Sequence, residues 1–287
     1  MTGGEEKLTR SAIIVVYRTP AELTALVAAL RSQTVPPDEI IIIDNGASEG
    51  EPVPDLEELQ GIRIERPGSN IGYGAGCNLG VRLAAGEDLL LLNADVVPTL
   101  CCNEALSERL QSNERVGVVG PRIYSGGTLQ ASARTFPSLR TGLLGRRSLL
   151  TRLMLGGRRW PAELSHSRGD GGPVDWVSGA CMMVRRSALA EVGGFDESYW
   201  MYWEDADLCR RLAEHDWAVH FEPDAIVHHA TGASGTNERT IHAFHESAAL
   251  FAGRWIASTR LERELFEKAL AFRGRLATRS FGRSRSK

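Results

Sequence analysis

Three carboxylates stand close together at the predicted start of a helix, in the order Glu204, Asp205 and Asp207. The residues directly before them, 199–203, include two tyrosines and two tryptophans. Aromatic rings beside carboxylates suit a sugar-binding pocket, in which a carboxylate can act as a general base. Two structural interpretations stay open, because acidic residues in a first helical turn also complement the helix dipole and aromatic residues also fill cores.

Two further segments carry groups that bind divalent cations. Asp95 follows the apolar stretch 89–92, and His228 and His229 follow the apolar stretch 225–227. Carboxylate oxygens bind Mg²⁺ or Mn²⁺ and imidazole binds Mn²⁺, so one histidine could complete a site begun by Asp95. The alternatives are a turn that ends a strand at Asp95 and a structural role for the histidines.

Amide and carboxylate side chains also occur where a nucleotide could bind. Asp44 follows the stretch 39–43 (EIIII) and could hydrogen-bond a base or ribose, with an Asp-Asn-Gly turn as the alternative. The glycine-rich segment 70–80 (NIGYGAGCNLG) would let a phosphate or base approach the backbone, and it adds Asn70 and Asn78. Its spacing, G-x-G-x-x-x-G, departs from the dinucleotide fingerprint and disfavours a nicotinamide-dependent oxidoreductase.

The elements that must position these groups alternate between strands and helices. Near-continuous apolar strands are typical of a parallel sheet that is buried on both faces. Asp44, Asn93 and Asp95 follow the carboxyl ends of such strands, where open α/β sheets bind ligands. The predicted order is a strand at 12–17, a helix through Leu23, Leu26, Val27 and Leu30, strands at 39–43 and 62–65, a helix over 75–85 and a strand at 89–92.

The composition is that of an ordinary globular protein. The 287 residues are 43% hydrophobic, enough for one large domain or two small ones. Asn93 and Asp95 interrupt the longest apolar run, so no membrane-spanning helix of about 20 apolar residues is predicted. The acidic, polar segment 1–10 does not resemble a secretory signal, and five cysteines without a Cys-x-x-Cys pair predict reduced core thiols. We therefore expect a cytoplasmic protein.

Charge is distributed unevenly along the chain. The formal net charge is −3, yet the segment 134–159 contains seven arginines and no acidic residue, and the segment 254–287 contains ten basic and three acidic residues. This asymmetry predicts an anionic partner, and no aromatic pattern or motif of nucleic-acid binding accompanies the charge. In the second segment, helical periodicity places five apolar residues within one arc, namely Leu261, Leu265, Ala269, Phe272 and Leu276.

Six segments share the order and spacing of a known enzyme family: IIVVYRTP, IIIDNGASEG, NIGYGAGCN, LLLLNADV, WVSGACMMVRRSALAEVGGFDESYWMYWEDADLCRRL and HHATGAS. Together they resemble family 2 glycosyltransferases of the GT-A fold. The resemblance implies an α/β, Rossmann-like fold with a mostly parallel central sheet flanked by helices. We expect a transferase domain at 1–237, with a nucleotide-binding part at 11–100 and an acceptor part at 101–237, followed by a helical basic C-terminal extension at 238–287.

The family's motifs imply a role for each candidate residue. Asp205 takes the position of the catalytic base, with Glu204 and Asp207 as supporting residues. Asp95 takes the position of the metal-binding aspartate of the Asp-x-Asp motif, and His229, with His228 as a rival, takes that of a second ligand for Mg²⁺ or Mn²⁺. The nucleotide-sugar site would be lined by Tyr17, Asp44, Asn70, Gly74, Asn78, Asn93 and Asp95. The acceptor site would be lined by Trp176, Tyr199, Trp200 and Trp203.

The long central motif, the segment 132–140 (SARTFPSLR) and the basic tail are most similar to bacterial rhamnosyltransferases, especially actinobacterial ones that act on a polyprenyl-diphosphate-linked N-acetylglucosamine. This similarity implies inverting transfer of L-rhamnose from dTDP-rhamnose to a hydroxyl of a lipid-linked saccharide, in cell-wall or polysaccharide assembly. The site of action would be an anionic membrane surface, at the inner face of the cell membrane. A transferase for another UDP-, GDP- or dTDP-sugar and a non-catalytic nucleotide-sugar-binding module are the alternatives, and a homodimer is compatible with the sequence.

The chain differs from the processive synthases of the same family. Arg254 and Trp255 resemble the end of their Gln-x-x-Arg-Trp motif, but Phe251 stands at the glutamine position. Since no spanning helices are predicted either, processive polymer synthesis is not expected.

Overall fold

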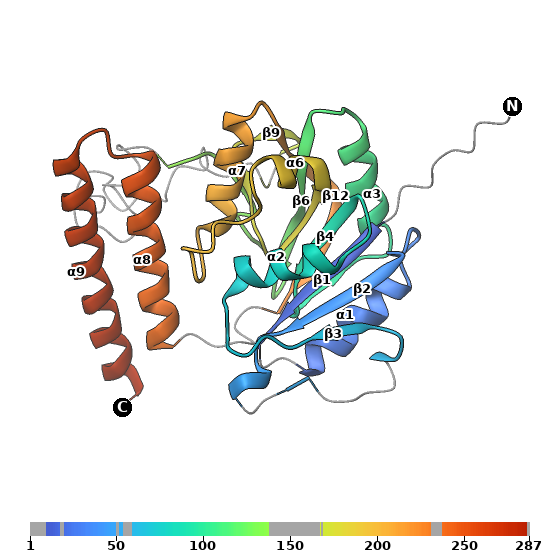
Figure 1. The fold of residues 1–287 in the computed structure, drawn as a ribbon, viewed down its shortest axis with the longest axis horizontal. Helices are drawn as coiled ribbons and strands as arrows, with labels where there is room; N and C mark the ends of the chain where they lie inside the picture. Colours follow the sequence, from blue (N-terminus) through green and yellow to red (C-terminus); the bar gives the residue numbers. More distant parts are fainter. Residues whose placement is uncertain are drawn as a thin grey trace, which may run out of the picture.

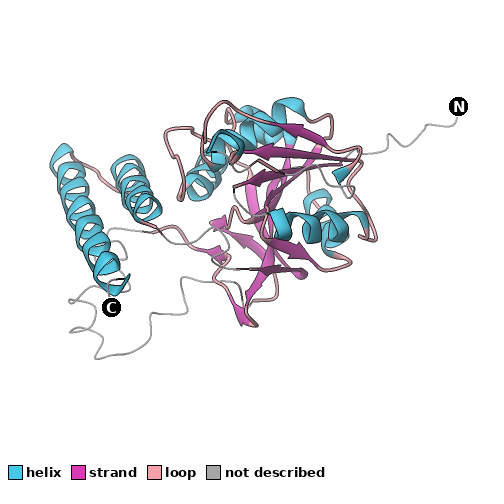
Figure 2. Ribbon diagram, turned by 90° about the horizontal axis from the view of Figure 1, so that it is seen from below, coloured by secondary structure: helices cyan, strands magenta, loops and turns pink. Residues whose placement is uncertain are grey.

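Strand β1 (Arg10–Val16) lies inside a ten-stranded sheet in the computed structural model, which describes residues 10–17, 20–49, 52–53, 59–137, 167, 169–230 and 237–285. The hydrogen-bonded order is β3-β2-β1-β4-β11-β6-β12-β5, with β7 paired to β6 and β9 paired to β12. Helices cover both faces of this sheet (Figure 1), and two C-terminal helices lie to one side of it (Figure 2). The other strands of the sheet are β2 (Glu39–Asp44), β3 (Arg63–Glu65), β4 (Asp88–Asn93), β5 (Val96–Pro98), β6 (Val116–Ser125), β7 (Thr128–Leu129), β9 (Gly172–Val174), β11 (Cys181–Arg185) and β12 (Ala218–His229).

The first four strands along the chain pair in parallel. Ile13 of β1 lies opposite Ile41 of β2 and Leu91 of β4, and β3 pairs with the outer side of β2. Helix α1 (Pro20–Arg31) connects β1 to β2, and helix α2 (Tyr73–Leu83) connects β3 to β4. The predicted α/β alternation is therefore confirmed, and the carboxyl ends of these strands meet at one edge of the sheet.

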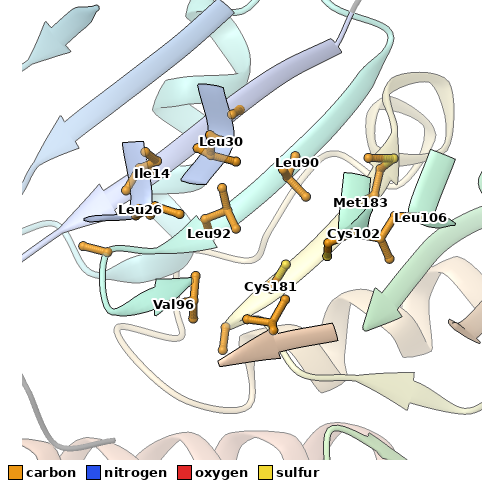
Figure 3. Close-up of a cluster of buried hydrophobic side chains, with 14 of the residues drawn as sticks. Ile14, Leu26, Leu30, Leu90, Leu92, Val96, Cys102, Leu106, Cys181 and Met183 are labelled. Atoms are coloured by element: carbon orange, nitrogen blue, oxygen red, sulfur yellow. The ribbon is translucent and has the colours of Figure 1, made fainter. Parts of the chain in front are cut away.

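Alternate residues of each strand pack on opposite faces, which is why the strands read as continuous apolar runs. On one face, Ile14 belongs to a cluster with Leu26 of α1 and Leu106 of α3 (Cys102–Gln111), shown in Figure 3. On the other face, Ile13 belongs to a cluster with Leu208 of α7 (Glu204–Glu214). Both faces of the sheet are thus buried under helices.

The second half of the sheet is mixed and brings distant segments together. β11 lies antiparallel between β4 and β6, and helix α6 (Arg186–Glu191) follows it. β12 runs parallel to β6 and antiparallel to β5, with His229 opposite Val96. This pairing places the end of β12 beside the turn that follows β4. A separate two-stranded sheet joins β8 (Ala133–Arg134) to β10 (Trp176–Val177).

The C-terminal residues form two helices, α8 (Glu238–Trp255) and α9 (Arg260–Arg285), which pack side by side. The helical character predicted for the residues after 238 is confirmed, and a capping box divides this stretch into two helices. The backbone N–H of Thr259 donates to the Glu262 carboxylate (3.1 Å), and the N–H of Glu262 donates to Thr259 Oγ1 (3.2 Å). The Thr-x-x-Glu pattern in the sequence is the local cause of the break.

The apolar arc of α9 lies on the side of the helix turned away from α8. Gly274 marks the α8 side, because a Cβ there would lie 3.3 Å from the Cβ of His245. Leu265 and Phe272 remain 58% and 61% exposed, so α9 presents large hydrophobic side chains to solvent. In the part of the chain that the structure describes, no helix is long and apolar enough to cross a membrane.

The cysteines carry no disulfide, since all five are free thiols. Four of them are buried, as predicted: Cys77, Cys102, Cys181 and Cys209. The prediction of a core position is wrong for Cys101, which is exposed at the start of α3 because the neighbouring residue takes the inward position.

Candidate active site

A cavity of about 540 Å³ opens beside the carboxyl ends of β1, β2 and β4, and the first turns of α8 form part of its wall. Its lining residues come from segments that are far apart in the sequence. They include ten of the residues that the sequence predicted for the site: Tyr17, Asn70, Asn93, Asp95, Trp176, Trp200, Trp203, Glu204, Asp205 and His229.

The carboxylate of Asp205 lines this cavity from the first turn of α7. Each of its oxygens accepts a backbone N–H, Oδ2 from Gly179 at 2.9 Å and Oδ1 from Ala206 at 2.8 Å. Burial raises the pKa of this carboxyl, although the two N–H donors and the guanidinium of Arg134 oppose the rise. Two oxygens held in this way keep lone pairs for a substrate hydroxyl, as a general base requires.

Glu204 lines the same cavity and is only 6% exposed. Its pKa is raised well above the ordinary value, mainly because of burial and further because of the negative charge of Asp205. Its Oε2 atom has no hydrogen-bond partner among the described residues. Adjacent buried carboxylates avoid carrying two negative charges, which is why the charge of Asp205 adds to the effect of burial on the pKa of Glu204.

The turn before Glu204 contains two consecutive non-glycine residues in the left-handed backbone region, Tyr202 (φ 67°) and Trp203 (φ 68°). Such conformations cost about 1–3 kcal/mol each and cluster at functional sites. Two rings of α8 pack on this turn: Phe244 lies 5.6 Å from the Tyr202 ring centroid, and Phe251 lies 5.1 Å from that of Trp203. Helix α8 thus supports the strained turn that leads into the carboxylates of α7.

Asp95 and His229 lie next to each other in the cavity wall. His229 Nε2 is 3.1 Å from Asp95 Oδ1, and its Nδ1 is 3.4 Å from Gln130 Oε1. The structure does not bring His228 to Asp95, because His228 is exposed and its ring lies 6.1 Å from that of Tyr124. A carboxylate and an imidazole suit Mg²⁺ or Mn²⁺. Among the described residues, no cluster of three or more metal-binding side chains occurs.

The loop before α2 is held against the aromatic turn. Gly72 has φ 85°, and a Cβ there would lie 2.2 Å from the carbonyl oxygen of Trp200, so only glycine fits. That carbonyl accepts the N–H of Tyr73 at 3.1 Å, and the Trp200 indole donates to the carbonyl of Asn70 at 3.3 Å. Asn45 donates to the Gly72 carbonyl at 2.9 Å, while its buried Oδ1 has no partner among the described residues. This oxygen is an acceptor that a bound nucleotide sugar could use.

Asp44 lies beside the cavity and not among its lining residues. It is 1% exposed, accepts the N–H groups of Gly46 (3.1 Å) and Val53 (2.7 Å), and lies 3.4 Å from the guanidinium of Arg66. These contacts shape the loop that follows β2. The nucleotide contact of Asp44 stays a prediction.

Gly74 and Asn78 of α2 also lie outside the lining, and both contact the turn at residues 193–196, which has the sequence Gly-Gly-Phe-Asp. Asn78 exchanges two hydrogen bonds of 2.9 Å with the backbone of Phe195. A Cβ on Gly74 would lie 3.1 Å from the Cβ of Phe195. The two residues therefore anchor this turn on α2, and their contacts with a nucleotide sugar stay predictions.

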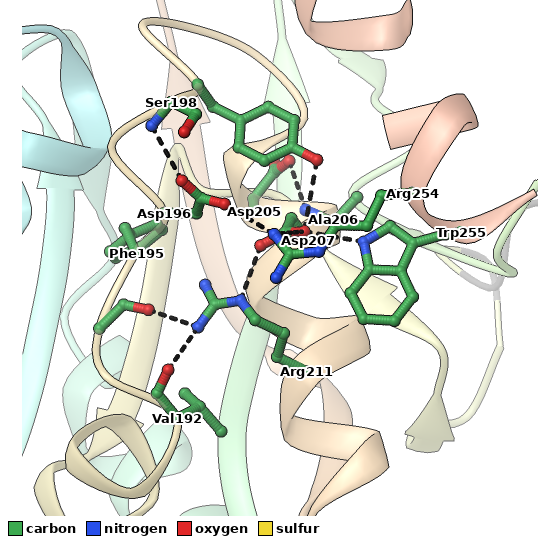
Figure 4. Close-up of polar contacts among 12 residues, drawn as sticks. Val192, Phe195, Asp196, Ser198, Asp205, Ala206, Asp207, Arg211, Arg254 and Trp255 are labelled. Atoms are coloured by element: carbon green, nitrogen blue, oxygen red, sulfur yellow. Dashed lines mark hydrogen bonds and ion pairs between the residues drawn. The ribbon is translucent and has the colours of Figure 1, made fainter. Parts of the chain in front are cut away.

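Asp207 is fully buried and binds four side chains away from the cavity (Figure 4). Its Oδ2 accepts from Arg211 at 2.7 Å, and its Oδ1 accepts from the Trp255 indole at 2.7 Å and from Arg254 at 3.3 Å. The hydroxyl of Tyr199 donates to the same oxygen at 3.3 Å. Neither Asp207 nor Tyr199 lines the cavity. Together they fasten α7 to the end of α8, and the Arg-Trp pair of α8 takes part in this contact.

Arg134 and Arg239 line the cavity, although the sequence analysis predicted neither as a site residue. The Arg134 guanidinium lies 4.8 Å from the ring centroid of Trp176, its partner across β8 and β10. The Arg239 guanidinium, in the first turn of α8, lies 4.1 Å from the ring centroid of Trp200. A sequence signal existed for Arg134, which belongs to the segment SARTFPSLR. For Arg239 the only local signal is the asparagine that caps α8.

The cavity contains a carboxylate of the kind that can act as a base, Asp205, and a carboxylate and imidazole of the kind that can bind a cation, Asp95 and His229. The chain belongs to glycosyl transferase family 2, whose sequence profile matches residues 11–193. The family predicted from the motifs is thereby confirmed, and the chain is a glycosyltransferase.

Within this family the chain is similar over most of its length to a mycobacterial enzyme. The N-acetylglucosaminyl-diphospho-decaprenol L-rhamnosyltransferase of Mycobacterium tuberculosis is 32% identical, over 93% of this chain and 92% of that protein. The pre-mycofactocin glycosyltransferase of the same organism is 30% identical, over 76% of this chain and 42% of the relative. The predicted similarity to rhamnosyltransferases is therefore confirmed.

Solved structures of glycosyltransferases share the fold. The crystal structure of GalNAc-T7 with UDP, GalNAc and Mn²⁺ matches with a TM-score of 0.57 and 17% identity, over 93% of this chain and 55% of that one. The crystal structure of S. aureus TarS matches with a TM-score of 0.52 and 13% identity, over 90% of this chain and 42% of that one. At this identity the matches concern the fold alone, and they confirm the predicted fold class.

Proposed function

We propose that Asp205 is the general base of an inverting, single-displacement sugar transfer. The acceptor hydroxyl gives its proton to Asp205 while its oxygen bonds to the anomeric carbon of the donor sugar. The bond from that carbon to the diphosphate oxygen breaks, and the nucleoside diphosphate leaves with its electron pair. The observation that carries the proposal is the Asp205 carboxylate, held by two backbone N–H groups in the cavity that also contains Asp95 and His229.

In the same proposal, Asp95 and His229 hold Mg²⁺ or Mn²⁺. When bound, the cation offsets the negative charge on the departing diphosphate. The pair fits such an ion because it offers a carboxylate oxygen and an imidazole nitrogen 3.1 Å apart in the cavity wall. Mg²⁺ is commonly bound by one or two carboxylates together with substrate phosphates, and the GalNAc-T7 structure, which shares the fold, contains UDP and Mn²⁺.

The proposed donor is dTDP-L-rhamnose, and the proposed acceptor is N-acetylglucosamine on a polyprenyl diphosphate. The support is the similarity to the mycobacterial relative, whose name states an L-rhamnosyl transfer and an N-acetylglucosaminyl-diphospho-decaprenol acceptor. The rings of Trp176, Trp200 and Trp203 line the cavity and offer surfaces on which a sugar can pack. This lipid-linked saccharide belongs to cell-wall or polysaccharide assembly.

The proposed place of action is an anionic membrane surface at the inner face of the cell membrane. Interfacial helices combine an apolar stripe with basic residues, and α9 combines exposed Leu265 and Phe272 with several arginines. Basic residues near an anionic surface contribute about 1 kcal/mol each. The other basic segment, 134–159, lies largely outside the described residues. In this proposal residues 1–237 form the transferase domain, and within the extension 238–287 it is helix α9 that contacts the membrane.

Replacing Asp205 by asparagine tests the base. Transfer is expected to fall by about 10²- to 10⁴-fold, because the side chain can no longer take a proton. Binding of the donor, measured by thermal shift with Mg²⁺ or Mn²⁺ present, is expected to stay as in the wild type. Asp224→Asn, at an exposed position outside the cavity lining, is the control and should keep full transfer. Wild-type turnover by Asp205→Asn would refute the assignment.

A panel of UDP-, GDP- and dTDP-sugars tests the donor in the same thermal-shift assay. Stabilisation by dTDP-rhamnose is the expected result, because a ligand that binds only the folded state raises its melting temperature. Stabilisation by a different nucleotide sugar alone would overturn the rhamnosyl assignment while leaving the transferase assignment in place.

A further inference from the structure

The cavity contains two arginines, and each lies over a tryptophan that the family resemblance assigns to the acceptor site, Trp176 for Arg134 and Trp200 for Arg239. Among the described residues that line it, Arg134 and Arg239 are the arginines, and no lysine occurs. The side built from the ends of β1, β2 and β4 contributes asparagines and Asp95 instead. A neutral sugar acceptor gives no reason for guanidinium groups on its side of the cavity, whereas an acceptor that carries phosphate does.

Arg134 is tied to the catalytic carboxylate. It lies over the ring of Trp176, and its charge lowers the pKa of Asp205. A group that acts on the base by its charge lies close to the reacting hydroxyl. The phosphate of a glycosyl diphosphate is attached to the anomeric carbon, so a sugar ring separates it from the hydroxyl that reacts. The cation that binds the phosphate must therefore lie further from Asp205.

Arg239 lines the cavity from the first turn of α8, and its position is fixed by its surroundings. Its guanidinium stacks on Trp200 at 4.1 Å, and the Trp200 indole is itself bonded to the carbonyl of Asn70. The backbone of Arg239 lies between Asn237 and Thr240, which form a capping box with bonds of 2.9 and 3.0 Å. A guanidinium stacked on an aromatic face in this way is preorganised to present its N–H groups to phosphate oxygens.

A second groove begins where the cavity ends. It has a volume of about 320 Å³, and it shares Trp200 and Arg239 with the cavity. From there it follows one face of α8 past His242 and Glu246 to the exposed Leu250. The guanidinium of Arg239 lies at the end of the groove that adjoins the cavity. The imidazole of His242 follows along α8, and Glu246 lies one turn further along. An anion is therefore favoured at Arg239 and His242, with room for its further substituent along α8.

We propose that Arg239, assisted by His242, binds the diphosphate of a lipid-linked acceptor while the acceptor sugar lies in the cavity against Asp205. The inference rests on the proposed function and deepens it, because it assigns the acceptor's anionic group to helix α8. This helix follows the segment 11–193 that the family profile matches. The acceptor specificity is thus contributed by residues outside the matched segment.

The test compares two acceptors that differ in the diphosphate. One is N-acetylglucosamine linked to a short polyprenyl diphosphate, and the other is an alkyl N-acetylglucosaminide without phosphate. For Arg239→Ala, KM for the diphosphate acceptor is expected to rise by about 10- to 100-fold. This is the loss of affinity expected when hydrogen bonds to a charged group are removed. KM for the alkyl acceptor and the Kd of the donor should not change, and Arg239→Lys should recover part of the loss.

Arg115→Ala is the matched control. Arg115 is exposed like Arg239 and also stacks on a tryptophan, with its guanidinium 5.5 Å from the ring centroid of Trp217, but it does not line the cavity or the groove. Its replacement should leave both acceptors unaffected. An unchanged KM for the diphosphate acceptor in Arg239→Ala, or an equal change for both acceptors, would overturn the assignment of Arg239.

The outcome for the wild-type enzyme separates the two proposals. A wild type that uses the diphosphate acceptor, together with an Arg239→Ala variant that uses it equally well, overturns only the role of Arg239. A wild type that binds dTDP-rhamnose but neither binds nor glycosylates the diphosphate acceptor overturns the proposed acceptor, and the diphosphate site with it.

Discussion

Replacing Asp207 by alanine is expected to loosen helix α8 from helix α7 without removing any group from the cavity. Asp207 is fully buried and accepts hydrogen bonds from Arg211, Arg254 and Trp255. After the change, Arg254 keeps Asp196 at 2.6 Å. Arg211, only 11% exposed, loses the carboxylate that lies 2.7 Å from its Nε.

The size of the effect follows from the charge that is left behind. Removing one partner of a buried ion pair costs about 3–5 kcal/mol, because the other charge stays buried. Arg211 keeps hydrogen bonds of 2.7 Å to the carbonyl oxygens of Val192 and Gly194, which places the loss near the lower end. We therefore expect about 3 kcal/mol. At about 2–4 °C per kcal/mol for domains of 150–250 residues, the melting temperature should fall by about 6–12 °C.

Thermal unfolding of three variants measures this effect. Asp207→Asn keeps an oxygen for the Trp255 indole and removes the charge, so its loss should be smaller than that of Asp207→Ala. Asp224→Ala removes an exposed carboxylate and should change the free energy of unfolding by no more than about 0.5 kcal/mol. Calorimetry gives the three melting temperatures. Binding of the nucleotide sugar, measured at a temperature at which each variant is folded, then shows whether the nucleotide side of the cavity is intact.

Two results would refute this reasoning. One is a melting temperature of Asp207→Ala equal to that of the Asp224→Ala control, which would mean that Asp207 does not hold the two helices together. The other is an Asp207→Ala protein of wild-type stability that has lost sugar transfer, which would assign Asp207 to the chemistry. In the expected case the variant is unstable but binds the nucleotide sugar normally when folded.

Three further predictions address the base, the membrane and the cation. Arg134→Ala should move the acidic limb of the pH–rate profile to higher pH. Asp205 must be ionised to act as a base, and burial already raises its pKa. The guanidinium of Arg134 lowers this pKa, so its removal should raise the pKa further. A limb that stays in place would contradict this coupling. Replacing Leu265 and Phe272 by aspartate should reduce flotation with anionic phospholipid vesicles, whereas Leu100→Asp, at a position that is also 58% exposed, should not. Equal binding of the wild type to neutral and anionic vesicles at low salt would exclude an anionic surface as the partner. Excess chelator should stop transfer, and added Mg²⁺ or Mn²⁺ should restore it; undiminished transfer in chelator would exclude the proposed cation.

Local patterns were sufficient to predict the parallel half of the sheet. Strands buried on both faces must be apolar at successive positions, so β1, β2 and β4 are visible as short runs without any knowledge of their partners. The helix that begins at Glu204 was also predicted, because acidic residues gather in its first turn. The break before α9 was missed, although the pattern of Thr259 and Glu262 carries it locally.

For the candidate site, too, the sequence predicted some features and only the structure showed others. Motif positions predicted Asp205, Asp95 and His229, and the structure places all three in one cavity. Asp95 and His229 are 134 residues apart in the chain, and only the antiparallel pairing of β5 with β12 brings them together. The sequence could suggest either histidine, because the two are adjacent, whereas the strand's register decides which one meets Asp95.

The sequence by itself determined the family, the α/β order of the elements and the chemical types of the groups at the strand ends, because these depend on local periodicity and on motifs. Only the tertiary structure decided where each carboxylate lies. Asp205 and Asp207 are two residues apart on one helix, so their side chains point in different directions. The packing of α8 against α7 buries Asp207 among Arg211, Arg254 and Trp255 and leaves Asp205 facing the cavity. The different positions of these two carboxylates depend on contacts between residues nearly 50 positions apart. No local sequence pattern predicts such contacts.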